Sequence, residues 1–143
     1  MLLGEFKHNL DSKNRVTLPA KLRTELGEKP VLTRGLDNCL FIYPNRDWQL
    51  FIEKLNKLPL GQAKARNFKR FILSGADEIV VDDMGRILIP ESLKKYSDLK
   101  KEIVIIGVGD RIELWSEDVW NKYIEESEKS SSDIAEGLSE FGI

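Results

Sequence analysis

The stretch DSKNRVTLP, Asp11 to Pro19, recurs as DDMGRILIP, Asp82 to Pro90. In both stretches an Asp is followed four positions later by an Arg, then by alternating apolar residues and a Pro. The correspondence continues downstream, where Trp48 recurs as Trp120, and we predict that both are core residues of the closing helices. Self-similarity of this kind is an internal duplication, and it decides the fold class before any other feature. Two copies are too few for a solenoid, so we predict one chain that folds as two related halves around a shared core.

The residues between each Asp and Arg predict a tight turn between two short strands, because Asp and Asn side chains bond nearby backbone groups in turns. The position before the Arg is Asn14 in the first copy and Gly85 in the second. Asn and Gly are the residues that most readily accept a positive φ angle. We therefore predict a left-handed residue before each Arg, and we expect Asp11 and Asp82 to structure the turns.

The strand that follows each turn alternates between apolar and polar residues, and side chains two apart in a strand share a face. Arg15 and Arg86 are therefore predicted to point outward beside the turn. The inward positions are Val16, Leu18, Ile87 and Ile89.

Each unit continues with a short helix, a hairpin and a closing helix. Gly27 is a predicted stop for the first short helix, and Asn45 and Ser116 are predicted N-caps of the closing helices. Between the halves, Leu60 to Ser74 predict a further helix with an apolar side. Its basic side could bind phosphate, contact a neighbouring subunit or simply solvate the helix, and it consists of Lys64, Arg66, Lys69 and Arg70.

We divide the chain accordingly. Residues 5–48 are the first repeat, 49–75 the connecting helices, 76–120 the second repeat, and 121–143 the end of the last helix with an acidic tail. The fold class predicted is α+β, mainly β, with flanking helices.

Charge is distributed unevenly along the chain, although its formal net charge is only −2. Residues 1–109 carry 19 basic and 14 acidic side chains, whereas residues 110–143 carry 3 and 10. A basic footprint is typical of nucleic-acid binders, and the first 109 residues have that sign. The acidic, serine-containing tail is predicted to be partly disordered or peripheral.

Other site classes have weak support. Asp82 and Asp83 flank a turn and have no paired counterpart in the first copy, which argues against a catalytic carboxylate pair. His8 lacks the second His or Cys that a zinc site needs, and Cys39 lies in an apolar strand. We predict no enzyme activity, no metal, no cofactor and no small-molecule substrate. No apolar run approaches the ~20 residues of a membrane-spanning helix, so we predict a cytoplasmic protein.

The paired DxxxR turns, the GLDNCLFIYP hairpin and the stretch RFILSGADEIVVDDMGRILIP resemble the MraZ family, bacterial proteins built of two SpoVT/AbrB-type units. The resemblance covers about residues 1–125 and leaves out the tail. It implies a swapped-hairpin β-barrel of the AbrB class formed by the two repeats. It also implies a nucleoid-associated transcriptional regulator of the cell-division and cell-wall gene cluster, assembled as a ring-shaped homo-oligomer.

The turn chemistry agrees with binding to double-stranded DNA. An Arg fork can bond phosphate or guanine bidentately, and a two-stranded ribbon can enter the major groove. A ring presents the same edge repeatedly, so we expect it to bind direct-repeat promoter boxes. The predicted DNA-binding residues are Arg15, Lys13, Asn14, Arg86, Lys7 and His8, and the turn-structuring residues are Asp11, Asp82 and Gly85.

Two alternatives stay open on the sequence alone. The DxxxR pattern is also what a hairpin with an internal ion pair would require. The chain could also be an AbrB-type partner-binding or assembly module without a specific operator. The acidic Asp83 makes the second turn less basic than Ser12 and Lys13 make the first, which puts an equal role for the two turns in doubt.

Overall fold

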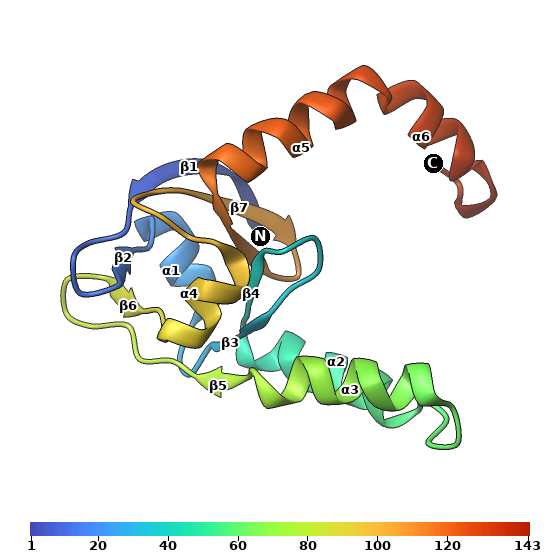
Figure 1. Ribbon diagram of the computed structural model, residues 1–143, viewed down its shortest axis with the longest axis horizontal. Coiled ribbons are helices and arrows are strands. Elements are labelled where there is room, and N and C mark those ends of the chain that lie inside the picture. Colours follow the sequence, from blue (N-terminus) through green and yellow to red (C-terminus); the bar gives the residue numbers. More distant parts are fainter.

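Eight strands and six α-helices make up the computed structural model, which describes residues 1–143 (Figure 1). The strands are β1 (Leu2–Asn9), β2 (Arg15–Thr17), β3 (Val31–Arg34), β4 (Leu40–Tyr43), β5 (Asp77–Glu78), β6 (Arg86–Leu88), β7 (Glu102–Gly109) and β8 (Ile112–Ser116). The helices are α1 (Ala20–Leu26), α2 (Asn45–Asn56), α3 (Ala63–Ser74), α4 (Glu91–Ser97), α5 (Glu117–Lys129) and α6 (Ser131–Gly137), followed by a 3₁₀ turn at Ser139–Phe141.

The two halves interleave their strands. One antiparallel sheet has the order β1-β7-β8-β4-β3-β5, and β2 pairs with β6 in a second, two-stranded sheet. Four pairings join a strand of one half to a strand of the other: β1 with β7, β4 with β8, β3 with β5, and β2 with β6. The prediction that the two halves fold around a shared core is therefore confirmed.

The predicted closed barrel is not confirmed, because the strands form two separate sheets. The two halves differ at the edge that would close it. β1 has eight residues, whereas β5, at the corresponding place in the second half, has only Asp77 and Glu78. Helix α3 extends to Ser74 and occupies the chain that would otherwise lengthen β5.

Successive side chains of the large sheet point to its opposite faces, so the core consists of two clusters, one on each face. One cluster fills the space between this sheet, the β2–β6 pair and helices α1 and α4. It contains the four predicted inward residues of β2, β6 and their ends, each at most 1% exposed. The other cluster lies on the opposite face, beneath α2, α3 and α5. Trp48 and Trp120 are both buried there, as their repeat-equivalent positions indicate, and so is Cys39.

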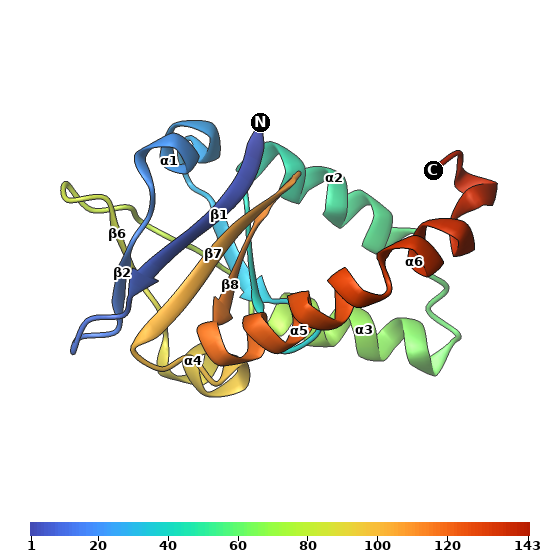
Figure 2. The same cartoon turned by 90° about the horizontal axis from the view of Figure 1, so that it is seen from above.

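The layout separates two ends of the molecule. In both views the β2–β6 pair and its turns lie at one end of the long axis, while the α2–α3 pair and the α5–α6 arm extend toward the other (Figures 1 and 2). None of the helices has the length and apolar character to cross a membrane.

Two helix ends differ from prediction, and a third agrees with it in position only. Helix α3 begins at Ala63 rather than Leu60, because the chain first turns at Pro59, whose carbonyl accepts from the Gln62 N–H. Asn45 is not an N-cap but the first residue of α2, and its side-chain amide instead donates to the Lys29 carbonyl at 3.2 Å. Ser116 does occupy the N-cap of α5, but its hydroxyl makes no capping bond.

The acidic tail is helical, contrary to the prediction of partial disorder, and peripheral, as predicted. Helix α5 runs to Lys129, which pairs with Glu125 one turn earlier at 3.3 Å. Such i,i+4 pairs of opposite charge support exposed helices. Residues 131–143 are all exposed.

Candidate nucleic-acid interface

The first turn, Asp11–Arg15, is organised by one carboxylate. Asp11 Oδ1 accepts hydrogen bonds from the backbone N–H groups of Lys13 at 2.9 Å and Arg15 at 2.8 Å. The backbone is closed by a bond from the Asn14 N–H to the Asp11 carbonyl at 3.1 Å. Asn14 has a φ of 59°, so the predicted left-handed residue is confirmed. The short Asn side chain tolerates this conformation, which would strain most residues.

The second turn, Asp82–Arg86, repeats this geometry. Asp82 Oδ1 accepts from the N–H groups of Met84 at 2.9 Å and Arg86 at 2.8 Å. Gly85 has a φ of 78°, which confirms the second predicted left-handed residue. The same bonds thus arise from different intervening residues, so the Asp, the left-handed residue and the Arg are what the turn requires.

Each arginine is also bound to the Asp of its own turn. The distance from Arg15 Nε to Asp11 Oδ2 is 2.9 Å, and from Arg86 Nε to Asp82 Oδ2 it is 2.8 Å. The arginine side chains are 31% and 24% exposed. They are therefore half-buried rather than fully outward, and the ion-paired hairpin considered from sequence does form. The ion pair uses only Nε, and the two terminal nitrogens of each guanidinium make no hydrogen bond within the chain.

These bonds hold the pKa of Asp11 below its ordinary value of 3.8, chiefly through the Arg15 backbone N–H, and the Arg15 side chain adds to the effect. Because the folded-state pKa is depressed, the carboxylate stabilises the turn above the unfolded pKa, and this is lost as pH falls through the folded value. We expect the Arg15 amide to lose hydrogen-exchange protection only below about pH 4. An NMR titration of the Asp11 carboxyl carbon with a midpoint at or above 3.8 would contradict this assignment.

The two turns are anchored on each other's strands. β2 and β6 pair antiparallel, and the ladder continues beyond both of them. The Leu18 N–H donates to the Gly85 carbonyl at 2.9 Å, and the Ile89 N–H donates to the Asn14 carbonyl at 2.8 Å. Each half therefore fixes the left-handed residue of the other half, and both arginines belong to one two-stranded unit.

Side chains of helices α1 and α4 contact the turns, and the sequence analysis did not identify them. The Asn14 amide donates to Glu91 at 3.0 Å, and Lys94 Nζ donates to the Asn14 amide oxygen at 3.0 Å. At the second turn, a Cβ added to Gly85 would lie 1.3 Å from Arg23 Nη1. Arg23 and Lys94 are 71 residues apart, the same offset that relates the two turns. This offset is the sequence signal that could have identified both side chains as turn contacts.

The other predicted DNA-binding residues lie at different places. Lys13 is exposed in the first turn beside Asn14. Lys7 is in β1, where its ammonium pairs with Glu117 at 3.2 Å. His8 is half-buried in β1 opposite Ile103 of β7. The structure therefore brings Lys13, Asn14 and Arg15 together and keeps Lys7 and His8 in the neighbouring strand.

The interleaved strands and the paired turns define a protein built of two copies of one α/β unit. The profile of the family described as "MraZ protein, putative antitoxin-like" matches the chain twice, over residues 1–71 and 72–141. Proteins called "Transcriptional regulator MraZ" match over 143 residues that cover all of both chains. They are 53% identical in Caldicellulosiruptor saccharolyticus, 52% in Clostridium tetani and 50% in Halothermothrix orenii.

The chain belongs to the MraZ family. The family match extends to residue 141, so the limit near residue 125 expected from sequence was wrong. That limit rested on motifs of the two turns and the hairpin, and the charged helices α5 and α6 carry none of them. The tail is part of the family's second unit rather than an appendage to it.

Proposed function

We propose that the chain is a transcriptional regulator that binds specific double-stranded DNA through the arginines of its two turns. The observation that carries the proposal is that both arginines lie on one two-stranded unit, each oriented by an Asp through Nε, with both terminal nitrogens unengaged. The names of the full-length relatives support a role in transcriptional regulation.

The mode of binding follows from the chemistry of the fork. A guanidinium can bond the O6 and N7 atoms of guanine together, and a two-stranded ribbon fits the major groove of B-DNA. The Asp11–Arg15 pair reduces the freedom that Arg15 would lose on binding, because preorganised side chains incur a smaller entropic cost. Lys13 is placed to contact a phosphate, and such contacts set the register of the ribbon on the duplex.

The proposed target is the gene cluster for cell division and the cell wall, including the chain's own promoter, as the family resemblance implies. The protein would then be associated with the nucleoid in the cytoplasm. Within this proposal, residues 5–48 and 76–120 act as two equivalent structural units joined by the α2–α3 segment. Their strands interleave in the manner of a swapped hairpin, without the closure of a full barrel.

We further propose that copies of the chain assemble into a ring. The helical end, away from the turns, exposes several large apolar side chains, and patches of such side chains mark protein–protein contacts. They lie on or near α2–α3 and on the α5–α6 arm with its terminal turn, and they are Leu50, Leu58, Leu60, Tyr123, Ile134, Leu138 and Phe141. Contacts made there would leave the turns free at the opposite end of each subunit (Figure 2).

A ring of this kind should bind direct repeats, since successive subunits present their turns in the same sense. We expect affinity to rise steeply with the number of promoter boxes spaced about 10 bp apart, and to fall when the spacing changes by about 5 bp. The measurement is a titration of duplexes carrying one to four boxes from the DNA upstream of the gene. Excess unrelated DNA serves as competitor.

Two results would count against the proposal in different ways. Equal affinity for single and multiple boxes would contradict the ring on repeats while leaving a DNA-binding turn in place. Binding that disappears entirely in competitor DNA, from a protein that still assembles, would favour the alternative of a partner-binding or assembly module. The exposed apolar side chains of the helical end are the observation that favours this second candidate.

A further inference from the structure

A cavity of about 640 Å³ lies beside the first turn. One wall is Asn9–Ser12, at the end of β1 and the start of the turn, and belongs to the first half of the chain. The other wall belongs to the second half and consists of Lys94 on α4 with Leu99–Lys101 in the segment that leads to β7. The two walls are joined by a hydrogen bond from the Leu10 N–H to the Lys101 carbonyl at 2.7 Å.

The lysines of this cavity form no close ion pair, although Lys100 and Lys101 also line a neighbouring depression with Glu102, Glu117 and Asp118. Lys94 Nζ donates to the Asn14 amide oxygen and pairs with no carboxylate. Lys100 lies 4.0 Å from Asp98, in a pair whose side chains are 68% and 70% exposed. An exposed pair of that length contributes little. Lys101 forms no ion pair. The carboxylate of the other wall, Asp11, is already bound to the guanidinium and backbone of its own turn.

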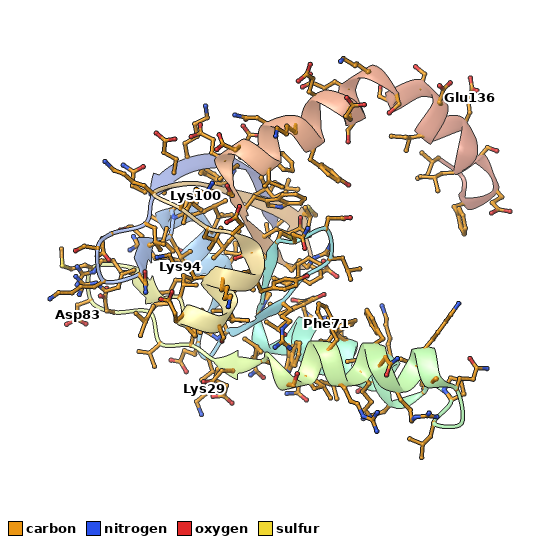
Figure 3. All side chains as sticks on the ribbon, in the orientation of Figure 1. Lys29, Phe71, Asp83, Lys94, Lys100 and Glu136 are labelled. Carbon is orange, nitrogen blue, oxygen red and sulfur yellow. The ribbon has the colours of Figure 1, made fainter.

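The corresponding place beside the second turn carries less positive charge. The repeat offset of 71 replaces Lys94 by Arg23, Lys100 by Lys29 and Lys101 by Pro30. It also replaces Ser12 of the turn by Asp83 and Lys13 by Met84, and it puts Glu28 where Leu99 stands. In Figure 3 Lys94 and Lys100 are labelled one above the other in the half of the molecule that holds the sheets, Asp83 at the outer end of that half and Lys29 at its lower edge. The two turns thus share their geometry, but the surroundings of the first turn are more positive.

We propose that Lys94, Lys100 and Lys101, the lysine cleft, bind the phosphate backbone of the DNA beside the first turn. The proposal rests on the proposed function and extends it. An ammonium is a compact cation that binds phosphate as a point charge, and phosphate contacts position a protein while base contacts specify the sequence. The second half of the chain therefore supplies backbone contacts for the arginine of the first half. Beside Arg86 the equivalent cations are only Arg23 and Lys29, with Glu28 and Asp83 next to them, so the first turn should contribute more to binding.

The test uses the full-length protein with two double variants that lower the net charge equally. Lys100→Gln/Lys101→Gln removes charge from the cleft. Lys54→Gln/Lys57→Gln removes exposed, unpaired lysines at the end of α2 and serves as the matched control, provided that sedimentation shows the native state of assembly. Binding to a promoter duplex and to a random duplex is measured over a range of salt concentrations. Each lost phosphate contact should lower the log–log salt slope by about 0.9.

For the cleft variant we expect a slope lower by about 1.8 per bound chain on both duplexes, with the preference for promoter over random DNA retained. The control should keep the native slope, and Lys100→Arg/Lys101→Arg should restore it. A cleft variant with the native slope, or a control variant with the same loss of slope, would overturn the proposal. In either case, Arg15-dependent DNA binding by the native chain would leave the proposed function standing. A native chain that binds neither duplex would overturn both.

Discussion

Arg15→Ala is expected to weaken promoter binding by about 1–3 kcal/mol per bound chain, the typical discrimination of a bidentate guanine contact. The preference for promoter over random DNA should fall by the same amount, because the lost contact is the one that reads a base. The melting temperature should change little, since the Arg15 side chain is half-buried and bonds only Asp11 through one nitrogen. Isothermal titration against both duplexes, with thermal unfolding alongside, measures the two effects separately.

Arg86→Ala is the matched control, because its turn has the same bonds and a similar exposure. We expect a smaller loss of affinity from it, since Asp83 lies in the same turn and repels phosphate. Equal losses from the two variants would show that the turns contribute alike. A large fall in the melting temperature of Arg15→Ala with unchanged affinity would instead show that Arg15 only stabilises the hairpin through its ion pair.

Gly107→Ala is expected to be strongly destabilising, by about 1–3 kcal/mol or more, as for overpacking in a filled interior. Gly107 lies in β7 opposite Gly4 of β1. A Cβ at this position would approach the Leu2 carbonyl carbon and the Leu3 backbone nitrogen, both at 2.5 Å. These are backbone atoms of a paired strand, and they cannot move away without breaking the ladder between the two halves.

Denaturant unfolding of this variant is best compared with Gly61→Ala, in the loop between α2 and α3. An added Cβ there meets nothing within 4 Å, so its effect should stay within about 0.5 kcal/mol. If Gly107→Ala has the same denaturant midpoint as the native chain, β1 does not pack against β7 as closely as the structure shows.

Much of the fold could be predicted from one comparison of the sequence with itself. Asn14 and Gly85 differ in chemistry but share the ability to adopt positive φ, and their equivalence indicated the turn conformation in both copies. The alternation that follows gave the buried face of β2 and β6 correctly. The repeat also identified Trp48 and Trp120 as core residues, since two large aromatics at one equivalent position indicate a shared packing role.

The remainder depended on contacts between distant segments. Nothing near Asn14 in the sequence indicates that Lys94 would bond its side chain, because β2 and β6 must first pair before α4 reaches the first turn. Asn45 has good capping chemistry, but its amide binds the Lys29 carbonyl, and tertiary contact overrides local preference. The open edge of the sheet depends on where α3 ends, and a difference of a few residues there shortens β5 to two.

The pairing of β1 with β7 has a consequence for how the chain is made. Leu2 pairs with Gly109, so β1 leaves the ribosome well before β7, the strand that pairs with its edge. Domains generally fold as units during synthesis, the N-terminal one first, but here the first half has no complete sheet of its own to form. The nascent chain therefore carries an unpaired β1 until β7 emerges, and we expect this non-local pairing to be a slow step of folding.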